Sequence, residues 1–134
     1  GFTPIVSSAP KDHHSLLQLY LDGPKDKTFY VFSSQEKKKL KINSKIFGKK
    51  VKFLNKKKYE HVKQSQKNAF IKTLKEKNIP FEEISIRRFD EDTIGKLFFL
   101  FIFQTIVFSK ILKVNAFDQP AVESVKILTK KLLI

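Results

Sequence analysis

Residues 97–103, Leu-Phe-Phe-Leu-Phe-Ile-Phe, constrain the fold of this chain more than any other stretch. An apolar run on every side of a helix leaves no face for water, so we expect that helix to be buried nearly all round. Polar residues from Gln104 to Lys110 interrupt the apolar character before it reaches the roughly 20 residues that a bilayer requires. The sequence therefore predicts a buried core helix over about residues 90–114 and no membrane partner.

Strands and helices alternate along the rest of the chain. Residues 28–32 are β-branched and aromatic, and apolar residues recur through 81–89, as expected for two strands. Between them, residues 56–77 have helical periodicity, with Asn55 as the expected N-cap. This alternation predicts an α/β fold, a sheet flanked by helices, and 134 residues suffice for one domain over 1–134.

The charge is the unusual bulk property. Lys and Arg number 27 and the net charge is +14, yet the only arginines are Arg87 and Arg88, and cysteine is absent. Base-reading proteins favour arginine, so this lysine excess is more typical of AT-rich coding than of a designed binding face. We expect no specific nucleic-acid partner and a solvated lysine-rich connector over residues 33–50, with lysine clusters at 37–39 and 49–50. An anion-binding patch in the connector and a basic polyanion-binding domain remain the alternatives.

Residues 115–126, Asn-Ala-Phe-Asp-Gln-Pro-Ala-Val-Glu-Ser-Val-Lys, have the pattern of a binding site. Pro120 suits the first position of a helix, where its missing N–H costs nothing. Gln119 and Lys126 are seven positions apart, so they share a helix face roughly 10 Å apart along the axis. The same helix carries a stripe that we expect to be buried: Ala121, Val125, Leu128 and Leu132.

This stretch resembles the C-terminal signature of the phosphoglucose isomerase family, Asn-x-Phe-Asp-Gln-x-(Gly/Ala)-Val-Glu-x-x-Lys. In that family the glutamine contacts the sugar phosphate and the lysine assists opening of the sugar ring. The resemblance therefore implies a substrate-binding role for Gln119 and a catalytic role for Lys126. On the residues alone, the alternative is a capped surface helix with a solvated lysine.

A second motif lies near the start of the chain. Asp12 is a suitable N-cap for a helix over residues 13–21, and Gly23-Pro24 ends it. The run Asp-His-His-Ser-Leu-Leu-Gln-Leu-Tyr-Leu-Asp-Gly-Pro is similar to bacterial phosphoglucose isomerases. On that match His14 takes the place of the catalytic histidine that helps to open the ring, a task that suits imidazole near neutral pH. His13 stands where those proteins have glutamine. Without the resemblance, both histidines are simply solvated.

At a third position this chain differs from the phosphoglucose isomerase family. Relatives have Glu-Thr-Ile at the end of the apolar helix, where this chain has Gln104-Thr105-Ile106. The Gln104 amide forms hydrogen bonds but does not pair electrostatically with a lysine. This change motivates an alternative in which the chain is a decayed remnant that keeps the fold without the chemistry.

The resemblance as a whole implies a C-terminal sugar-isomerase (SIS)-type domain with a mostly parallel sheet, belonging to a longer chain that continues before Gly1. It implies interconversion of glucose 6-phosphate and fructose 6-phosphate through a cis-enediol, in glycolysis and gluconeogenesis, with no cofactor and no metal. The family's proton-shuttling glutamate lies upstream, so we expect residues 1–134 alone to be inactive. A cytoplasmic homodimer is implied for the complete protein, with His14 acting across the subunit interface.

Overall fold

The computed structural model describes residues 3–34, 40–43 and 48–134. The chain divides into two compact units, Gly1–Arg88 and Phe89–Ile134, and each is described by itself. The expectation of a single domain over residues 1–134 stays a prediction. The lysine cluster at 37–39 lies outside the described residues.

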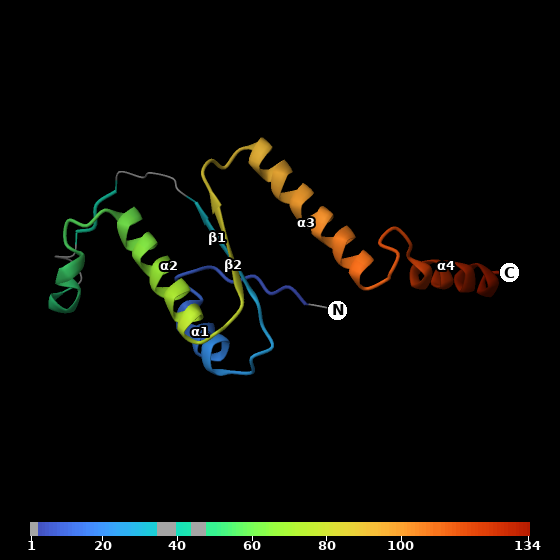
Figure 1. Ribbon diagram of the computed structural model, residues 1–134, viewed down its shortest axis with the longest axis horizontal. Helices are drawn as coiled ribbons and strands as arrows, with labels where there is room; N and C mark the ends of the chain where they lie inside the picture. Colours follow the sequence, from blue (N-terminus) through green and yellow to red (C-terminus); the bar gives the residue numbers. More distant parts are fainter. Residues whose placement is uncertain (1–2, 35–39, 44–47) are drawn as a thin grey trace. The chain divides into compact units, whose positions relative to one another are not determined.

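The first unit is built around two parallel strands (Figure 1). It contains α1 (His13–Asp22), β1 (Phe29–Ser34), the 3-10 helix η2 (Lys49–Leu54), α2 (Tyr59–Glu76) and β2 (Phe81–Ile86). Phe29 lies opposite Phe81, and Ser34 lies opposite Ile86. Parallel strands need a crossover connection, which η2 and α2 supply here. The predicted α/β fold, a parallel sheet flanked by helices, is confirmed.

The start of α2 differs from the expectation. Its N-cap is Lys58 rather than Asn55, which instead follows η2 and donates its N–H to the Lys52 carbonyl. Lys56 has a positive φ of 59°, which breaks helical geometry between the two helices. Lys41 also pairs with Lys58 in an antiparallel bridge, so residues just before Tyr59 are held in extended backbone.

The described core of the first unit lies at the end of α2, in the turn that follows and at the end of β2. Its buried hydrophobic residues are Ile71, Leu74, Ile79 and Ile86, and Leu74 is 0% exposed. Asn78 adopts the left-handed conformation, which asparagine tolerates better than most residues. The Ile79 N–H donates to the Leu74 carbonyl at 2.9 Å. This turn fixes the end of α2 against the start of β2.

The second unit consists of α3 (Glu91–Ile111) and α4 (Pro120–Leu132). Asp90 caps α3, because its Oδ1 accepts hydrogen bonds from the Thr93 N–H at 3.0 Å and from the Thr93 hydroxyl at 2.7 Å. The helix ends where Lys113 takes a φ of 55° and the Val114 N–H returns to the Ser109 carbonyl at 2.8 Å. Both ends of α3 are therefore fixed by local hydrogen bonds.

The expected burial of these two helices is wrong. Neither contains a buried residue: on α3, Phe98 is 67% exposed and Phe99 is 68% exposed, and on α4, Val125 is 65% and Leu132 is 78% exposed. The helical periodicity of apolar residues identifies a surface that is more stable when it is buried. Within residues 89–134, however, no other element buries residues of either helix. The apolar run therefore forms a regular helix without forming a core.

The helix α3 also has the length and composition of a membrane-crossing helix. It has 21 residues, an 18-residue window of it has a mean hydropathy of 1.7, and it is the one such helix in the part of the chain that the structure describes. A core helix of a water-soluble protein has the same length and composition, so this property is weak evidence for a membrane span.

Asp90→Ala should destabilise the protein by about 0.5–2 kcal/mol, because the first turn of α3 loses its side-chain acceptor. Urea denaturation followed by circular dichroism measures the change. Asp92→Ala is the matched control, since Asp92 forms only an exposed pair with Lys96, of the kind worth about 0.3–0.5 kcal/mol. Equal losses in the two variants would contradict the assigned cap.

Candidate functional site

The predicted catalytic histidine lies in the first turn of α1. His14 is exposed, whereas the neighbouring His13 is half-buried. The His13 ring packs against Phe70 of α2, with centroids 5.2 Å apart. Adjacent helical residues point about 100° apart, so packing of His13 turns His14 toward solvent. An exposed imidazole is accessible to a substrate.

An aromatic cluster holds α1 in place. Phe29 of β1 makes edge contacts with Phe70 of α2 at 5.7 Å and with Tyr20 of α1 at 5.5 Å. The Tyr20 hydroxyl also hydrogen-bonds to the Ser7 hydroxyl at 2.7 Å. Together with the His13–Phe70 contact, the cluster joins α1, α2 and β1, and thereby sets the orientation of His14.

Polar contacts fix the two ends of α1. Lys77 donates to Asp22 Oδ1 at 2.5 Å, and this hydrogen bond lowers the pKa of the Asp22 carboxyl. At the other end Asp12 occupies the N-cap position, but its carboxylate accepts from the Ser8 N–H at 2.6 Å and makes no capping bond within the helix. Asp12 therefore stabilises the approach to α1 rather than its first turn.

The second predicted motif forms the loop before α4 and its first turns. Asn115 Oδ1 accepts the Phe117 N–H at 3.0 Å, a local turn that directs the chain toward the helix. Gln119 is the N-cap and Pro120 occupies the first turn, as predicted. Lys126 follows two turns later, and its side chain is 68% exposed.

The Lys126 ammonium is loosely held. Its Nζ lies 3.5 Å from Glu123 Oε2, an exposed pair three residues apart, which contributes little to stability. The ammonium is thus oriented by Glu123 and remains accessible to an anionic or hydroxyl ligand. Lys126 lies on α4 and Gln119 directly precedes that helix with a non-helical backbone, so the shared helix face expected for the two residues stays a prediction; His14 belongs to the other unit.

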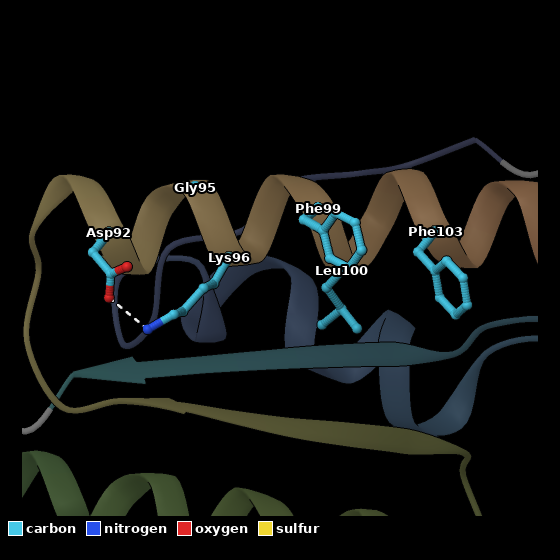
Figure 2. Close-up of a pocket in the computed structure, with 6 residues that line it drawn as sticks. All are labelled: Asp92, Gly95, Lys96, Phe99, Leu100 and Phe103. Carbon is cyan, nitrogen blue, oxygen red and sulfur yellow. Dashed lines mark hydrogen bonds and ion pairs between the residues drawn. The ribbon is translucent and has the colours of Figure 1, made fainter.

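A hollow of about 580 Å³ runs along one side of α3 and includes none of the predicted site residues (Figure 2). Asp92 and Lys96 pair at 2.6 Å at one end, and the hydrogen bond to Asp92 raises the pKa of Lys96. Phe99, Leu100 and Phe103 complete the lining. The i,i+4 spacing of Asp92 and Lys96 was the sequence signal for this pair. A single helix face with one exposed ion pair has no nucleophile or general base arranged for catalysis.

Gln104 and the metal-binding side chains complete the comparison with the sequence. Gln104 is half-buried on α3, where the sequence resemblance expected glutamate. Over residues 3–34, 40–43 and 48–134, no group of three His, Cys, Asp or Glu side chains is placed to hold a metal ion.

Known proteins similar to this chain were found by sequence and by structure, while no family model matches. The "Probable glucose-6-phosphate isomerase" of Methanococcus maripaludis is 34% identical, over 92% of this chain and 27% of that protein. The glucose-6-phosphate isomerase of Campylobacter jejuni is 31% identical, over 99% of this chain and 33% of that protein. A crystal structure of a hypothetical protein from Thermus thermophilus superposes with a TM-score of 0.70 and 26% identity, over 93% of this chain and 30% of that chain.

The chain thus spans about a third of the length of the curated relatives that it matches. The match to the Campylobacter jejuni protein extends over both motifs and the segment between them, because it covers 99% of the chain. The resemblance read from the two motifs is confirmed: this chain is similar, over nearly its whole length, to a part of the glucose-6-phosphate isomerases.

Proposed function

We propose that this chain is the C-terminal part of an aldose–ketose isomerase that interconverts glucose 6-phosphate and fructose 6-phosphate. The observation that supports the proposal is the arrangement at the start of α4, where Gln119 occupies the N-cap position without a side-chain capping bond and Lys126 is exposed two turns later. Several glucose-6-phosphate isomerases that match 92–99% of the chain support it.

Each proposed site residue has a distinct role. His14, exposed at the start of α1, exchanges a proton with the ring oxygen and so opens the sugar ring. Lys126 assists that step with its positive charge and its donor hydrogens. The Gln119 side chain hydrogen-bonds to the sugar phosphate. None of these steps requires a cofactor or a metal.

The complete reaction also needs a base that moves a proton between C1 and C2 of the open sugar, giving a cis-enediol. A carboxylate suits this task, and in the family it is a glutamate in the upstream part. We therefore propose that residues 1–134 alone are inactive and that activity belongs to the complete protein, a cytoplasmic homodimer. In such a dimer, His14 and Lys126 act in different active sites.

Lys126→Ala should lower kcat of the complete protein by about 100-fold, near the lower end of the effect of a positioned proton-transfer group. Production of glucose 6-phosphate from fructose 6-phosphate, coupled to a dehydrogenase, measures the rate. Lys130→Ala is the control, because Lys130 lies one turn further along α4 and outside the signature. A normal rate in Lys126→Ala, or an equal loss in Lys130→Ala, would remove Lys126 from the site.

A folded remnant without catalysis is the second candidate, and Gln104 is the observation that favours it. An amide at this half-buried position provides no negative charge for a neighbouring lysine. The upstream reading frame distinguishes the two candidates. An intact preceding domain with a glutamate base supports the enzyme, and its loss supports the remnant.

A further inference from the structure

Residues 40–59 present a concentration of positive charge that the isomerase proposal does not use. Seven exposed lysines lie in the described part of this segment: Lys41, Lys49, Lys50, Lys52, Lys56, Lys57 and Lys58. The sequence contains no Asp or Glu between Glu36 and Glu60. We call these seven lysines the basic surface.

The backbone brings lysines from distant parts of this segment side by side. Lys41 pairs with Lys58 in an antiparallel bridge, and the Ile42 N–H donates to the Lys57 carbonyl at 2.9 Å. Side chains directly opposite each other across such a pair are close neighbours, and like charges there are destabilising. An anion bound across the pair would relieve this repulsion.

Within the described residues, the basic surface is also not neutralised by carboxylates. In residues 40–43 and 48–59, no lysine forms an ion pair with a described carboxylate. Elsewhere lysines do find such partners: Lys67 pairs with Glu83, Lys77 with Asp22 and Lys96 with Asp92. The general lysine excess of the chain therefore does not account for this local arrangement.

A hollow and an exposed aromatic ring accompany the lysines. The hollow has a volume of about 320 Å³ and is lined by Lys41, Ile42, Asn43, Asn55 and Lys56. This volume lies at the lower end of the range of about 300–1,000 Å³ that small ligands occupy. Phe53 lies between two of the lysines in the sequence, and its side chain is 72% exposed. Aromatic rings beside positive charge are the surface on which unpaired bases stack.

We propose that the basic surface binds single-stranded nucleic acid through its phosphates, without preference for sequence. Lysine provides point charges for phosphate, while the scarcity of arginine disfavours reading of base edges. An anionic membrane fits less well, because membrane-surface segments place basic and apolar residues on opposite faces of one helix. Here the lysines come instead from an extended pair, the short helix η2 and the residues that connect η2 to that pair.

The test measures binding of a fluorescein-labelled oligouridylate of about 15 nucleotides to the full chain by fluorescence anisotropy. Titrations between about 50 and 200 mM salt give the slope of log K against log salt. Replacing Lys49, Lys50 and Lys52 together by glutamine should weaken binding on the order of 10-fold. Each phosphate contact of a single strand contributes about 0.7 to the slope. Because the variant loses three lysines, the slope should fall in magnitude by about 2.

The matched control replaces Lys75, Lys130 and Lys131 by glutamine, which removes the same charge from exposed positions elsewhere. It should leave the slope unchanged, and an equal loss in the control would overturn the proposal in favour of a general charge effect. Phe53→Ala should weaken binding by about 5-fold or more through lost stacking. Preference for phosphatidylserine vesicles over the oligouridylate at equal phosphate concentration would also overturn it. Isomerase activity is measured separately, so each proposal can fail alone.

Discussion

Replacing His14 by alanine in the complete protein is expected to lower kcat for fructose 6-phosphate by about 10²- to 10⁴-fold. A positioned proton-transfer group contributes an acceleration of this size. His14 is the exposed histidine of α1, and the aromatic contacts of its neighbour hold the helix in place. The coupled dehydrogenase assay gives kcat and KM, and circular dichroism shows whether the variant remains folded.

His13→Gln is the matched control for this prediction. The His13 ring packs on Phe70 with centroids 5.2 Å apart, so His13 serves the placement of α1. This variant should keep kcat within about 10-fold of the parent protein, because it retains His14. A large loss in His13→Gln, together with normal activity in His14→Ala, would mean that the two histidines have been assigned the wrong way round.

Leu74→Ala has the largest effect expected on stability, a loss of about 2–5 kcal/mol in the free energy of unfolding. Leu74 is 0% exposed in a described core that also contains Ile71, Ile79 and Ile86. Because this core is small, few side chains are able to fill the cavity that the substitution leaves. Urea denaturation of the full chain measures this loss.

Leu40→Ala removes the same atoms from a side chain that is 61% exposed. It should change the free energy of unfolding by no more than about 0.5 kcal/mol, the usual range for a surface position. Similar losses in the two variants would contradict the placement of the core at the end of α2.

Local signals in the sequence predicted the helices and strands closely. The helix expected over residues 13–21 spans His13–Asp22 and ends at Gly23, where a Cβ would lie 2.3 Å from the Leu19 carbonyl oxygen. Pro120 opens α4 as expected, and Asp90 caps α3. These features depend on residues within one or two turns of each other, so a short stretch of sequence suffices to predict them.

Features that depend on distant contacts were not predictable in the same way. The apolar residues of α3 and α4 show which faces avoid water, but not which surface covers them, and neither helix contains a buried residue. The delayed start of α2 results from the pairing of Lys41 with Lys58, which no periodicity reveals. The same pairing places lysines that are far apart in the sequence next to each other on the surface.

The candidate site also combines features that local sequence predicts with features that depend on distant contacts. The signature around Gln119 and Lys126 is one helix and its preceding loop, so the sequence predicted that helix and its start at Pro120. The packing of His13 on Phe70 joins residues 57 positions apart, and only the structure shows that it directs His14 outward.

The most direct test of the central proposal is fructose 6-phosphate turnover by the complete protein, followed as reduction of NADP by glucose-6-phosphate dehydrogenase. We predict turnover by the parent protein, and its loss in a folded variant that carries both His14→Ala and Lys126→Ala. Absence of turnover in the folded parent protein, or undiminished turnover in the double variant, would contradict the proposal.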